Sequence, residues 1–265
     1  MSDDRPIRTP TFDDCTVVIA GGTSGVGLET ARHFVRAGVQ RIGLVGRNAE
    51  RGEAAAAEIR GLASGIWCLF VSADLLDPAE AARATEELRA SLGDTDILIN
   101  SVAASYSPAL LHTLDPAEIP GIIASQLLPP VNMSRAALPA MREQHGGVII
   151  NIASDAAKVP TPGETVLGAA MAGIVMFSKT LAMEAKRDGI RVNAITPSLI
   201  TDSGSYDRVM AEPFSAKLFA KATTLASLGV AEPSDLAELI VFLSSPAARR
   251  ITGQAISPNG GISAG

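Results

Sequence analysis

Residues 15–27 read CTVVIAGGTSGVG, an apolar run from Cys15 that ends in a glycine-rich turn. The glycines Gly21, Gly25 and Gly27 follow a G-x-x-x-G-x-G spacing, and residues without a Cβ let the backbone approach a ligand closely. A helix is expected from Leu28 onward, and the first turn of a helix presents unpaired N–H groups to an anion. We therefore predict that this turn binds the phosphates of a dinucleotide. The alternative is a purely structural turn, which would need the same glycines.

Apolar runs and helical patterns alternate along the rest of the chain. Strands are predicted at 41–45, 66–71, 96–100, 147–153, 190–195 and 253–257, and helices at 49–62, 78–92, 116–144, 165–187 and 233–245. Strands that alternate with helices pair in parallel and are covered on both faces. The sequence thus predicts an α/β protein with a single doubly wound parallel sheet, the Rossmann fold, as one domain over residues 1–265. Within it, residues 1–14 are an expected N-terminal extension and 198–228 an irregular, mobile substrate lid.

The end of the second strand bears on the choice of cofactor. An acidic residue there would accept the ribose 2′-hydroxyl of NAD, but the chain has Gly46 followed by Arg47. A guanidinium can pair with a 2′-phosphate, so NADP(H) is favoured over NAD(H), the alternative being that Arg47 is only solvated. Asp74, after the third strand, is expected either to contact the adenine or to cap the helix that begins at Pro78.

Composition excludes several kinds of partner. The net charge is −6 without a basic run, so neither nucleic acid nor an anionic membrane surface is expected to bind. No apolar run is expected to span a bilayer, and the expected location is the cytoplasm. Cys15 and Cys68 lack a C-x-x-C or histidine neighbour, which predicts buried free thiols and no metal site.

The predicted helix 116–144 contains Pro120 and the pair Pro129-Pro130. A proline inside a helix leaves the carbonyl four residues earlier without its donor, and for Pro130 that residue is Gln126. We therefore expect a kink or a break in this helix.

These elements, in this order, resemble the classical short-chain dehydrogenase/reductase family from Thr16 to Gly261. The resemblance rests on Gly21, Gly25, Gly27, Asp74, Asn100, Asn151-Ile-Ala-Ser154, Gly189-Ile-Arg-Val-Asn-Ala-Ile-Thr-Pro197, Thr201, Ile251-Thr-Gly-Gln and Gly260-Gly261. It implies hydride transfer between NAD(P)H and a small organic substrate. The cofactor-binding residues that follow are Gly21, Thr23, Ser24, Gly25, Val26, Gly27, Arg47, Asn48, Asp74, Leu75, Asn100, Pro197, Ile200 and Thr201.

The catalytic positions depart from the family pattern. The resemblance implies a Ser, Tyr, Lys and Asn at the site, and Ser154 matches the Ser. Spacing from Ser154 and from Asn193 places the family's Tyr at Leu167 and its Lys at Met171, neither of which can donate a proton. Gln126 is the candidate for the Asn position, and Ser198 stands where the family usually has Gly.

Other side chains are candidates to replace the missing proton donor. Tyr106 is the tyrosine best placed to do so, because it follows the fourth strand, whereas Tyr206 lies in the expected lid. Lys158, Glu164 and His112 are further candidates, each of which can equally be an ordinary solvated or packing side chain. The predicted catalytic set is Ser154, Tyr106 and Gln126.

A stripe of small and apolar residues runs along the predicted helix 165–187 at helical spacing: Val166, Ala170, Gly173, Phe177 and Leu181. In the family this helix and the preceding one pair with their copies, so the resemblance implies a homodimer or homotetramer. The alternative is that the stripe faces only the sheet.

Three functions are consistent with the sequence. The favoured one is an NADP(H)-dependent oxidoreductase with a non-standard site, suited to an activated acceptor such as a conjugated C=C or quinone-like substrate. The alternatives are a non-redox enzyme that uses the same pocket for elimination, isomerisation or cyclisation, and a catalytically silent nucleotide-binding or regulatory protein.

Overall fold

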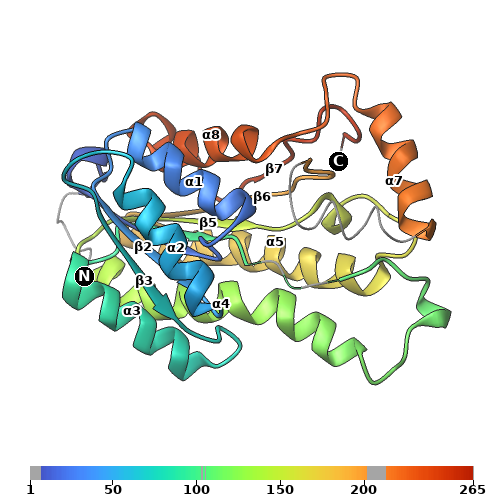
Figure 1. Ribbon diagram of the computed structural model, residues 1–265, viewed down its shortest axis with the longest axis horizontal. Helices are drawn as coiled ribbons and strands as arrows, with labels where there is room; N and C mark the ends of the chain where they lie inside the picture. Colours follow the sequence, from blue (N-terminus) through green and yellow to red (C-terminus); the bar gives the residue numbers. More distant parts are fainter. Residues whose placement is uncertain (1–6, 103, 105, 202–212, 265) are drawn as a thin grey trace.

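The structure is a computed structural model and describes residues 7–102, 104, 106–201 and 213–264. Seven parallel strands form one sheet in the order β3-β2-β1-β4-β5-β6-β7. In chain order they are β1 Thr16–Ala20, β2 Arg41–Gly46, β3 Trp67–Ser72, β4 Ile97–Asn100, β5 Gly147–Ile152, β6 Ile190–Ile195 and β7 Ala255–Ile256. The doubly wound parallel sheet is confirmed (Figure 1).

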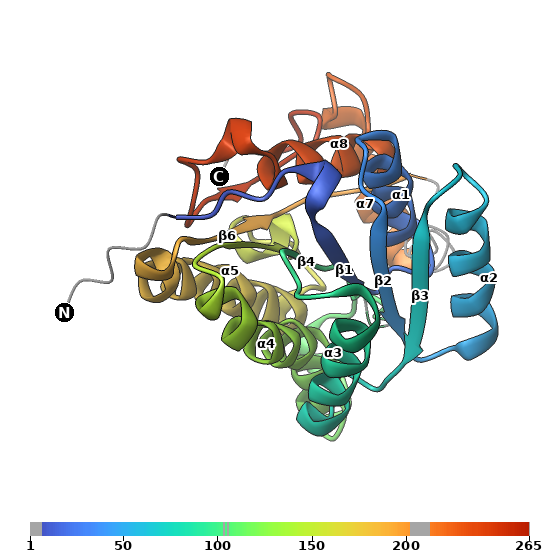
Figure 2. The same cartoon turned by 90° about the vertical axis from the view of Figure 1, so that its left-hand side faces the viewer.

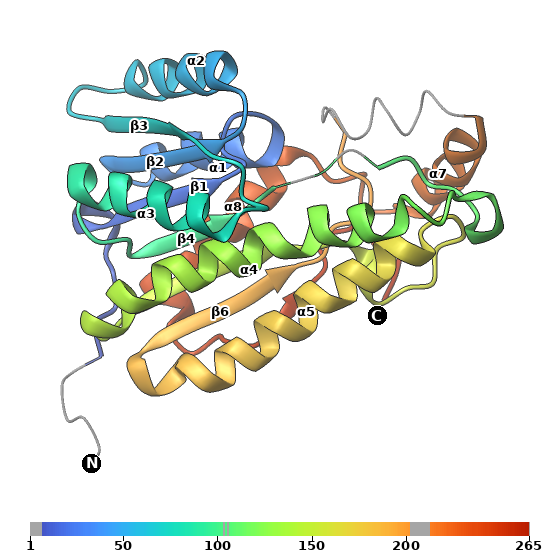
Figure 3. The same ribbon diagram turned by 90° about the horizontal axis from the view of Figure 1, so that it is seen from below.

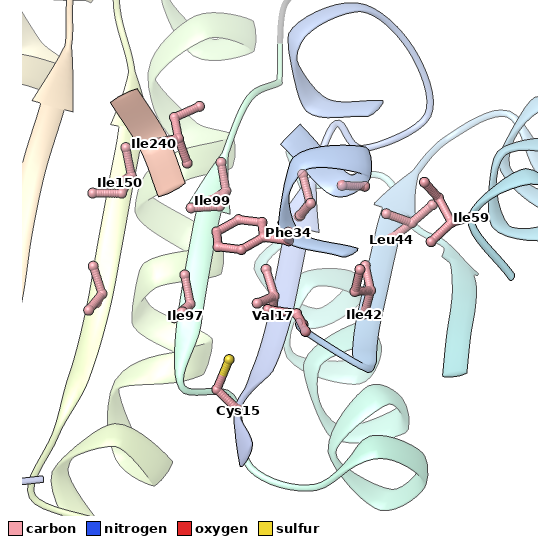
Figure 4. Packing of buried hydrophobic residues seen from close by; sticks show 14 of the residues in the cluster. Cys15, Val17, Phe34, Ile42, Leu44, Ile59, Ile97, Ile99, Ile150 and Ile240 are labelled. Carbon is pink, nitrogen blue, oxygen red and sulfur yellow. The ribbon is translucent and has the colours of Figure 1, made fainter. Parts of the chain in front are cut away.

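Helices cover both faces of the sheet. On one face lie α1 (Gly25–Arg36), α2 (Ala49–Arg60) and α8 (Pro233–Ser244); on the other lie α3 (Pro78–Leu92), α4 (Ile119–Glu143) and α5 (Thr165–Ala185) (Figure 2). The inner strands bury both faces, and β1 does so by alternation. Val17 and Ile19 point to the α1 side, where Figure 4 shows Val17 near Phe34, whereas Val18 and Ala20 point to the α3 side.

The helix α4 runs without interruption through Pro129 and Pro130, so the predicted break is wrong. Figure 3 shows it as one ribbon beside α5. Both prolines and Met133 are buried, and α4 packs along α3 and α5. Packing of that face therefore outweighs the two missing backbone hydrogen bonds.

The segment predicted to be an irregular lid contains a helix, α7 (Pro213–Leu225). Figure 1 shows α7 at the end of the molecule opposite the N-terminus, beyond the carboxyl ends of the strands. Residues 202–212 of the segment, including Tyr206, lie outside the described part of the chain. The signal for a helix was an apolar row of helical spacing, Leu218, Phe219, Ala222 and Leu225.

The apolar stripe on α5 is buried within its own chain. Val166, Ala170 and Leu181 are buried, and a Cβ on Gly173 would lie 3.3 Å from Leu127 on α4. Much of the stripe therefore packs within the chain, against the sheet and α4, and pairing of this helix with a second subunit stays a prediction.

One helix in the described ranges, Thr165–Asp188, is apolar and long enough to cross a membrane by length and composition, with a mean hydropathy of 1.7. This corrects the expectation that no such run exists. Since α5 packs on α4 and on the sheet, its hydrophobicity is accounted for by the core of the fold.

Both cysteines are buried free thiols, as predicted. Burial raises the pKa of each thiol to about 12. Neither is therefore ionised near neutral pH, and neither is suited to act as a nucleophile.

Candidate functional site

A cavity of about 1020 Å³ opens at the carboxyl ends of the strands. Its walls come from the loops after β1 to β6, from α4 and from α7. The strand order reverses between β1 and β4, and ligands of open α/β sheets bind outside the carboxyl ends at that point. The cavity is therefore the candidate active site.

The glycine-rich turn forms one wall of this cavity. Gly21 has φ +80°, and a Cβ there would lie 2.5 Å from the carbonyl oxygen of Ser101. A Cβ on Gly27 would lie 2.3 Å from the carbonyl oxygen of Gly21, so this glycine lets α1 start close to β1. Ser24 is the N-cap of α1 and makes no side-chain capping bond, which leaves the first-turn N–H groups of α1 without a side-chain partner from it.

Two arginines lie at the end of the cavity beside β2. Arg47 and Arg51 are both exposed and both line it. Arg51 Nε donates to Thr23 Oγ1 at 3.2 Å, and Asn48 caps α2 by accepting from the Arg51 N–H at 2.8 Å. Arg51 was not predicted from the sequence as a site residue. Its position in the predicted helix 49–62, one turn after Arg47, could have indicated that the two side chains lie close together.

Asp74 lines the cavity and does not cap the following helix. Asp77 does so, with its carboxylate accepting from the Ala79 N–H at 2.8 Å, while Asp74 accepts from the Leu76 N–H at 3.2 Å. The capping alternative for Asp74 is therefore wrong, and its carboxylate stays beside the cavity.

Most of the predicted site residues come together in this cavity. Those that line it are Gly21, Thr23, Ser24, Gly25, Val26, Arg47, Asn48, Asp74, Leu75, Tyr106, Gln126, Ser154, Pro197 and Ile200.

Three predicted cofactor residues do not line the cavity. Gly27 has the packing role given above. Asn100 is buried and donates to Asn151 Oδ1 at 2.8 Å, so it ties β4 to β5. Thr201 uses its backbone N–H to bond the Ala231 carbonyl at 3.0 Å.

Ser154 lies in the cavity together with Leu167 and Met171. Its Oγ accepts from the Ala156 N–H at 3.2 Å and caps the short 3-10 turn η3 (Asp155–Ala157), which leaves its own proton available. Gln126 on α4 is also at the cavity, buried, with Nε2 3.5 Å from the Ala104 carbonyl.

The proposed substitutes for the proton donor differ in their surroundings. Tyr106 lines the cavity, and its hydroxyl donates to the Gly163 carbonyl at 2.6 Å. Burial raises the pKa of this phenol. Lys158 does not line the cavity and donates to Ser257 Oγ, and His112 is exposed and does not line the cavity either.

Glu164 is the remaining candidate, and it lines the cavity. Burial raises the pKa of its carboxyl group to about 7, an effect that a hydrogen bond from the Thr161 side chain only partly opposes. No cation pairs with it among the described residues.

The C-terminal segment supplies another wall that the sequence did not indicate. Asp155 is buried and accepts from Ser257 Oγ at 2.9 Å, Asn259 Nδ2 at 2.7 Å and Ser263 Oγ at 2.7 Å. These bonds hold Ile262 and Ser263 against the cavity.

A doubly wound fold with a glycine-lined cavity at its switch point is typical of dinucleotide-binding proteins. The sequence profile of short chain dehydrogenases matches residues 15–210. The chain belongs to the short-chain dehydrogenase family.

Two curated relatives cover nearly the whole chain. An uncharacterized short-chain type dehydrogenase/reductase, y4mP, of Sinorhizobium fredii is 32% identical over 93% of this chain and 96% of its own length. The 3-oxoacyl-[acyl-carrier-protein] reductase FabG of Escherichia coli is 30% identical over 95% of this chain and 98% of its own.

Two solved structures are similar throughout. A 3-ketoacyl-(acyl-carrier-protein) reductase from Brucella melitensis complexed with NADH has a TM-score of 0.83 at 28% identity, covering 96% of this chain and 100% of that one. A short chain oxidoreductase from Pseudomonas aeruginosa PAO1, described as containing an atypical catalytic center, has a TM-score of 0.87 at 25% identity. The match covers 97% of this chain and 100% of that one.

Proposed function

We propose that the protein is an NADP(H)-dependent oxidoreductase that transfers hydride to or from a small organic substrate at a non-standard active site. The observation that carries the proposal is one cavity that holds both the glycine turn, with Arg47 and Arg51 beyond it, and Ser154. A bound nicotinamide cofactor would supply or accept the hydride.

The residues present fit such a cofactor. Gly21 leaves the space that a Cβ would fill, and the first turn of α1 offers N–H groups to a pyrophosphate. Arg47 and Arg51 would hold a 2′-phosphate, which supports the preference for NADP(H). Asp74 and Leu75 line the cavity near this end of the sheet and would flank the adenine.

The chemistry around Ser154 departs from the pattern of the family. Leu167 and Met171 line the cavity where the family's Tyr and Lys are expected, and neither has a transferable proton. A positioned general acid contributes about 10²- to 10⁴-fold in rate, so an efficient enzyme of this kind needs another donor or an activated substrate. Ser154 would donate a hydrogen bond to the substrate oxygen, and Gln126 would orient a water or a polar substrate group.

Titration calorimetry with NADPH and NADH tests the cofactor assignment. We expect tighter binding of NADPH, and about 3- to 10-fold weaker NADPH binding in each of Arg47→Gln and Arg51→Gln, since each removes one partly solvated ionic hydrogen bond. NADH affinity should not change in either. Arg135→Gln, an exposed arginine of α4 outside the cavity, is the matched control. Equal binding of both cofactors, unaffected by the variants, would reject the NADP(H) preference.

Isotope transfer tests the reaction class. With NADPH deuterated at both hydrogens of C4, deuterium should appear in the product of an accepted substrate. The panel should include acetoacetyl-CoA, an α-diketone, a cyclic enone and a quinone. Turnover of any panel compound with all deuterium retained in the cofactor would favour a non-redox enzyme instead.

The remaining expectations belong to the same proposal. We infer a homodimer or homotetramer, and the exposed Met176 and Met183 on the outward face of α5 offer an apolar surface for it. The free thiols of Cys15 and Cys68 are compatible with a reducing compartment such as the cytoplasm.

A further inference from the structure

We propose that Glu164 is the residue that gives and takes the proton in the reaction of this site, in place of the tyrosine that the family pattern would put at Leu167. The inference rests on the proposed function, because it assigns the proton that must accompany the hydride.

The first argument is position. Leu167 and Met171 lie three and seven residues after Glu164, and all three residues line the cavity. This spacing places them on the same side of α5, the side that faces the cavity. Glu164 stands at the N-cap of α5, about one turn, or roughly 5 Å along the axis, before Leu167. Ser154, on the loop after β5, lines the same cavity as Glu164.

The second argument is that the carboxyl group is not used for structure. Although Glu164 is the N-cap residue, its side chain makes no capping hydrogen bond to α5. The Thr161 hydroxyl is the polar side chain in contact with it, and no cation neutralises it among the described residues. Ionising a half-buried carboxyl group that has no ion pair costs free energy of desolvation. Groups of this kind in a cavity are concentrated at functional sites.

The third argument is that the other titratable groups are less suited to transfer the proton. Tyr106 interacts electrostatically with Glu164, and the other titratable groups of the loop after β5 and of α7 are Asp155, Lys158, Lys217 and Lys221. Tyr106 has its proton committed to the Gly163 carbonyl, and Asp155 accepts three hydrogen bonds from the C-terminal segment. Lys158 binds Ser257, while Lys217 and Lys221 are exposed on α7 and do not line the cavity.

The lining of the cavity also indicates the substrate. It includes the apolar side chains of Pro108, Val159, Leu218, Phe219, Leu225 and Ile262. Arginine and lysine line the cavity only through Arg47 and Arg51, at the β2 end, as far as the described residues show. We infer that the substrate is an uncharged, apolar carbonyl compound that binds in the part of this cavity away from the two arginines.

The proton step balances as follows for reduction. The Glu164 O–H bond breaks and its proton forms an O–H bond with the substrate oxygen, which holds the electron pair of the former C=O π bond. A bound nicotinamide cofactor would supply the hydride that reduces the carbonyl carbon, and would itself be the reductant. Glu164 is left as a carboxylate and regains a proton from water. Oxidation of the alcohol uses the same groups in reverse.

A group with a pKa of about 7 suits both directions near neutral pH. Reduction needs the protonated carboxyl group, so its rate in the wild type should fall as the pH rises above about 7. The oxidation rate should rise over the same interval, because it needs the carboxylate.

The test compares wild type with Glu164→Gln, which keeps the size of the side chain and removes its titration. Glu184→Gln, an exposed glutamate at the far end of α5, is the matched control. With deuterated NADPH and the panel compound that the wild type reduces fastest, Glu164→Gln should lower kcat about 10²-fold or more and abolish the fall above pH 7. NADPH affinity, measured by calorimetry, should stay within about twofold of wild type.

A second readout needs neither cofactor nor activity. In the cofactor-free protein labelled with ¹³C at the glutamate carboxyl carbon, one resonance should titrate near pH 7 and be missing from Glu164→Gln but present in Glu184→Gln.

Each result is decisive. Deuteride transfer at the wild-type rate and pH profile by Glu164→Gln would overturn the inference and leave the proposed function standing. Absence of deuteride transfer by the wild type itself across the panel would overturn both. A glutamate that titrates near pH 4.5 in every protein would overturn the assignment of the proton to Glu164.

Discussion

At the scale of single residues, Ser154 is the polar side chain that the proposed chemistry depends on most directly. Its Oγ already accepts a hydrogen bond from the Ala156 N–H, so its proton is free to be donated to a substrate oxygen at the cavity. The serine thus has a structural and a chemical role, and a substitution has to separate the two.

Ser154→Ala should lower the rate of deuteride transfer about 10²- to 10³-fold, as the loss of one hydrogen-bond donor to a developing oxyanion does. Steady-state kinetics with deuterated NADPH measures this. The loss of the cap on η3 should cost about 1 kcal/mol in the free energy of unfolding, and NADPH affinity should be preserved. Unchanged kcat in a folded variant would show that Ser154 only caps η3.

Glu164 makes a second prediction, which concerns stability. Because burial raises the pKa of its carboxyl group from 4.5 to about 7, the folded state binds more protons than the unfolded state between these two pH values. Its contribution to the free energy of unfolding is therefore fully present below about pH 4.5 and is lost as the pH rises to about 7. Urea unfolding of Glu164→Gln should lack this decline, and identical pH profiles for wild type and variant would contradict it.

At the scale of elements, the turn between β1 and α1 has two glycines whose roles differ. Both have positive φ, +80° at Gly21 and +52° at Gly25, but a Cβ meets the Ser101 carbonyl at Gly21 and meets nothing within 4 Å at Gly25. Gly25 is thus needed for its backbone conformation alone, whereas Gly21 is needed for both conformation and space.

Substituting each glycine by alanine separates these effects. Gly25→Ala should lower the free energy of unfolding by about 1–2 kcal/mol, the cost of a left-handed conformation. Gly21→Ala should cost about 1–3 kcal/mol more, since the strand-to-loop contact with Ser101 has to open. Urea unfolding without cofactor measures both free energies. Equal decreases in the two variants would show that the backbone at Ser101 moves away from the new Cβ without a measurable cost.

How well each element could be predicted depended on what stabilises it. The strands and α3 follow from local apolar patterns and a proline start, and their predicted bounds agree with the structure to within about a residue, except for β7, which is shorter than the predicted 253–257. The continuity of α4 could not be predicted from its local sequence. It depends on the packing of Pro129, Pro130 and Met133, and the residues they pack against lie far away in the sequence. The missed α7 had a readable apolar row, which its polar composition outweighed.

The candidate site shows the same division. The glycine turn, Arg47 and Ser154 could be found because motifs and strand ends mark them. The wall made by Asp155, Asn259 and Ser263 could not, because its hydrogen bonds join residues more than 100 positions apart. Glu164 was visible as a candidate, but its burial and the lack of an ion pair are properties of the folded chain.

At the scale of the whole molecule, cofactor binding should be measurable as stability. A ligand that binds only the folded state at about a hundredfold excess over its Kd stabilises it by about 2.7 kcal/mol. For a chain of this size that raises Tm by about 5–10 °C. Calorimetric scans with NADPH should show this rise, with a smaller one in the Arg47→Gln/Arg51→Gln double variant at the same concentration. A Tm unaffected by NADPH and NADH alike would contradict dinucleotide binding.

The hydrogen bonds of Asp155 also impose an order on biosynthesis. Its partners Ser257, Asn259 and Ser263 are 102, 104 and 108 residues downstream. At a translation rate of about 5–20 residues per second, a ribosome needs roughly 5–20 s to make that stretch. During this delay the loop after β5 has a carboxylate without its partners, and the cavity lacks one wall. A nascent chain that has already made its glycine turn must therefore wait for residues 257–263 to emerge before it can enclose a ligand.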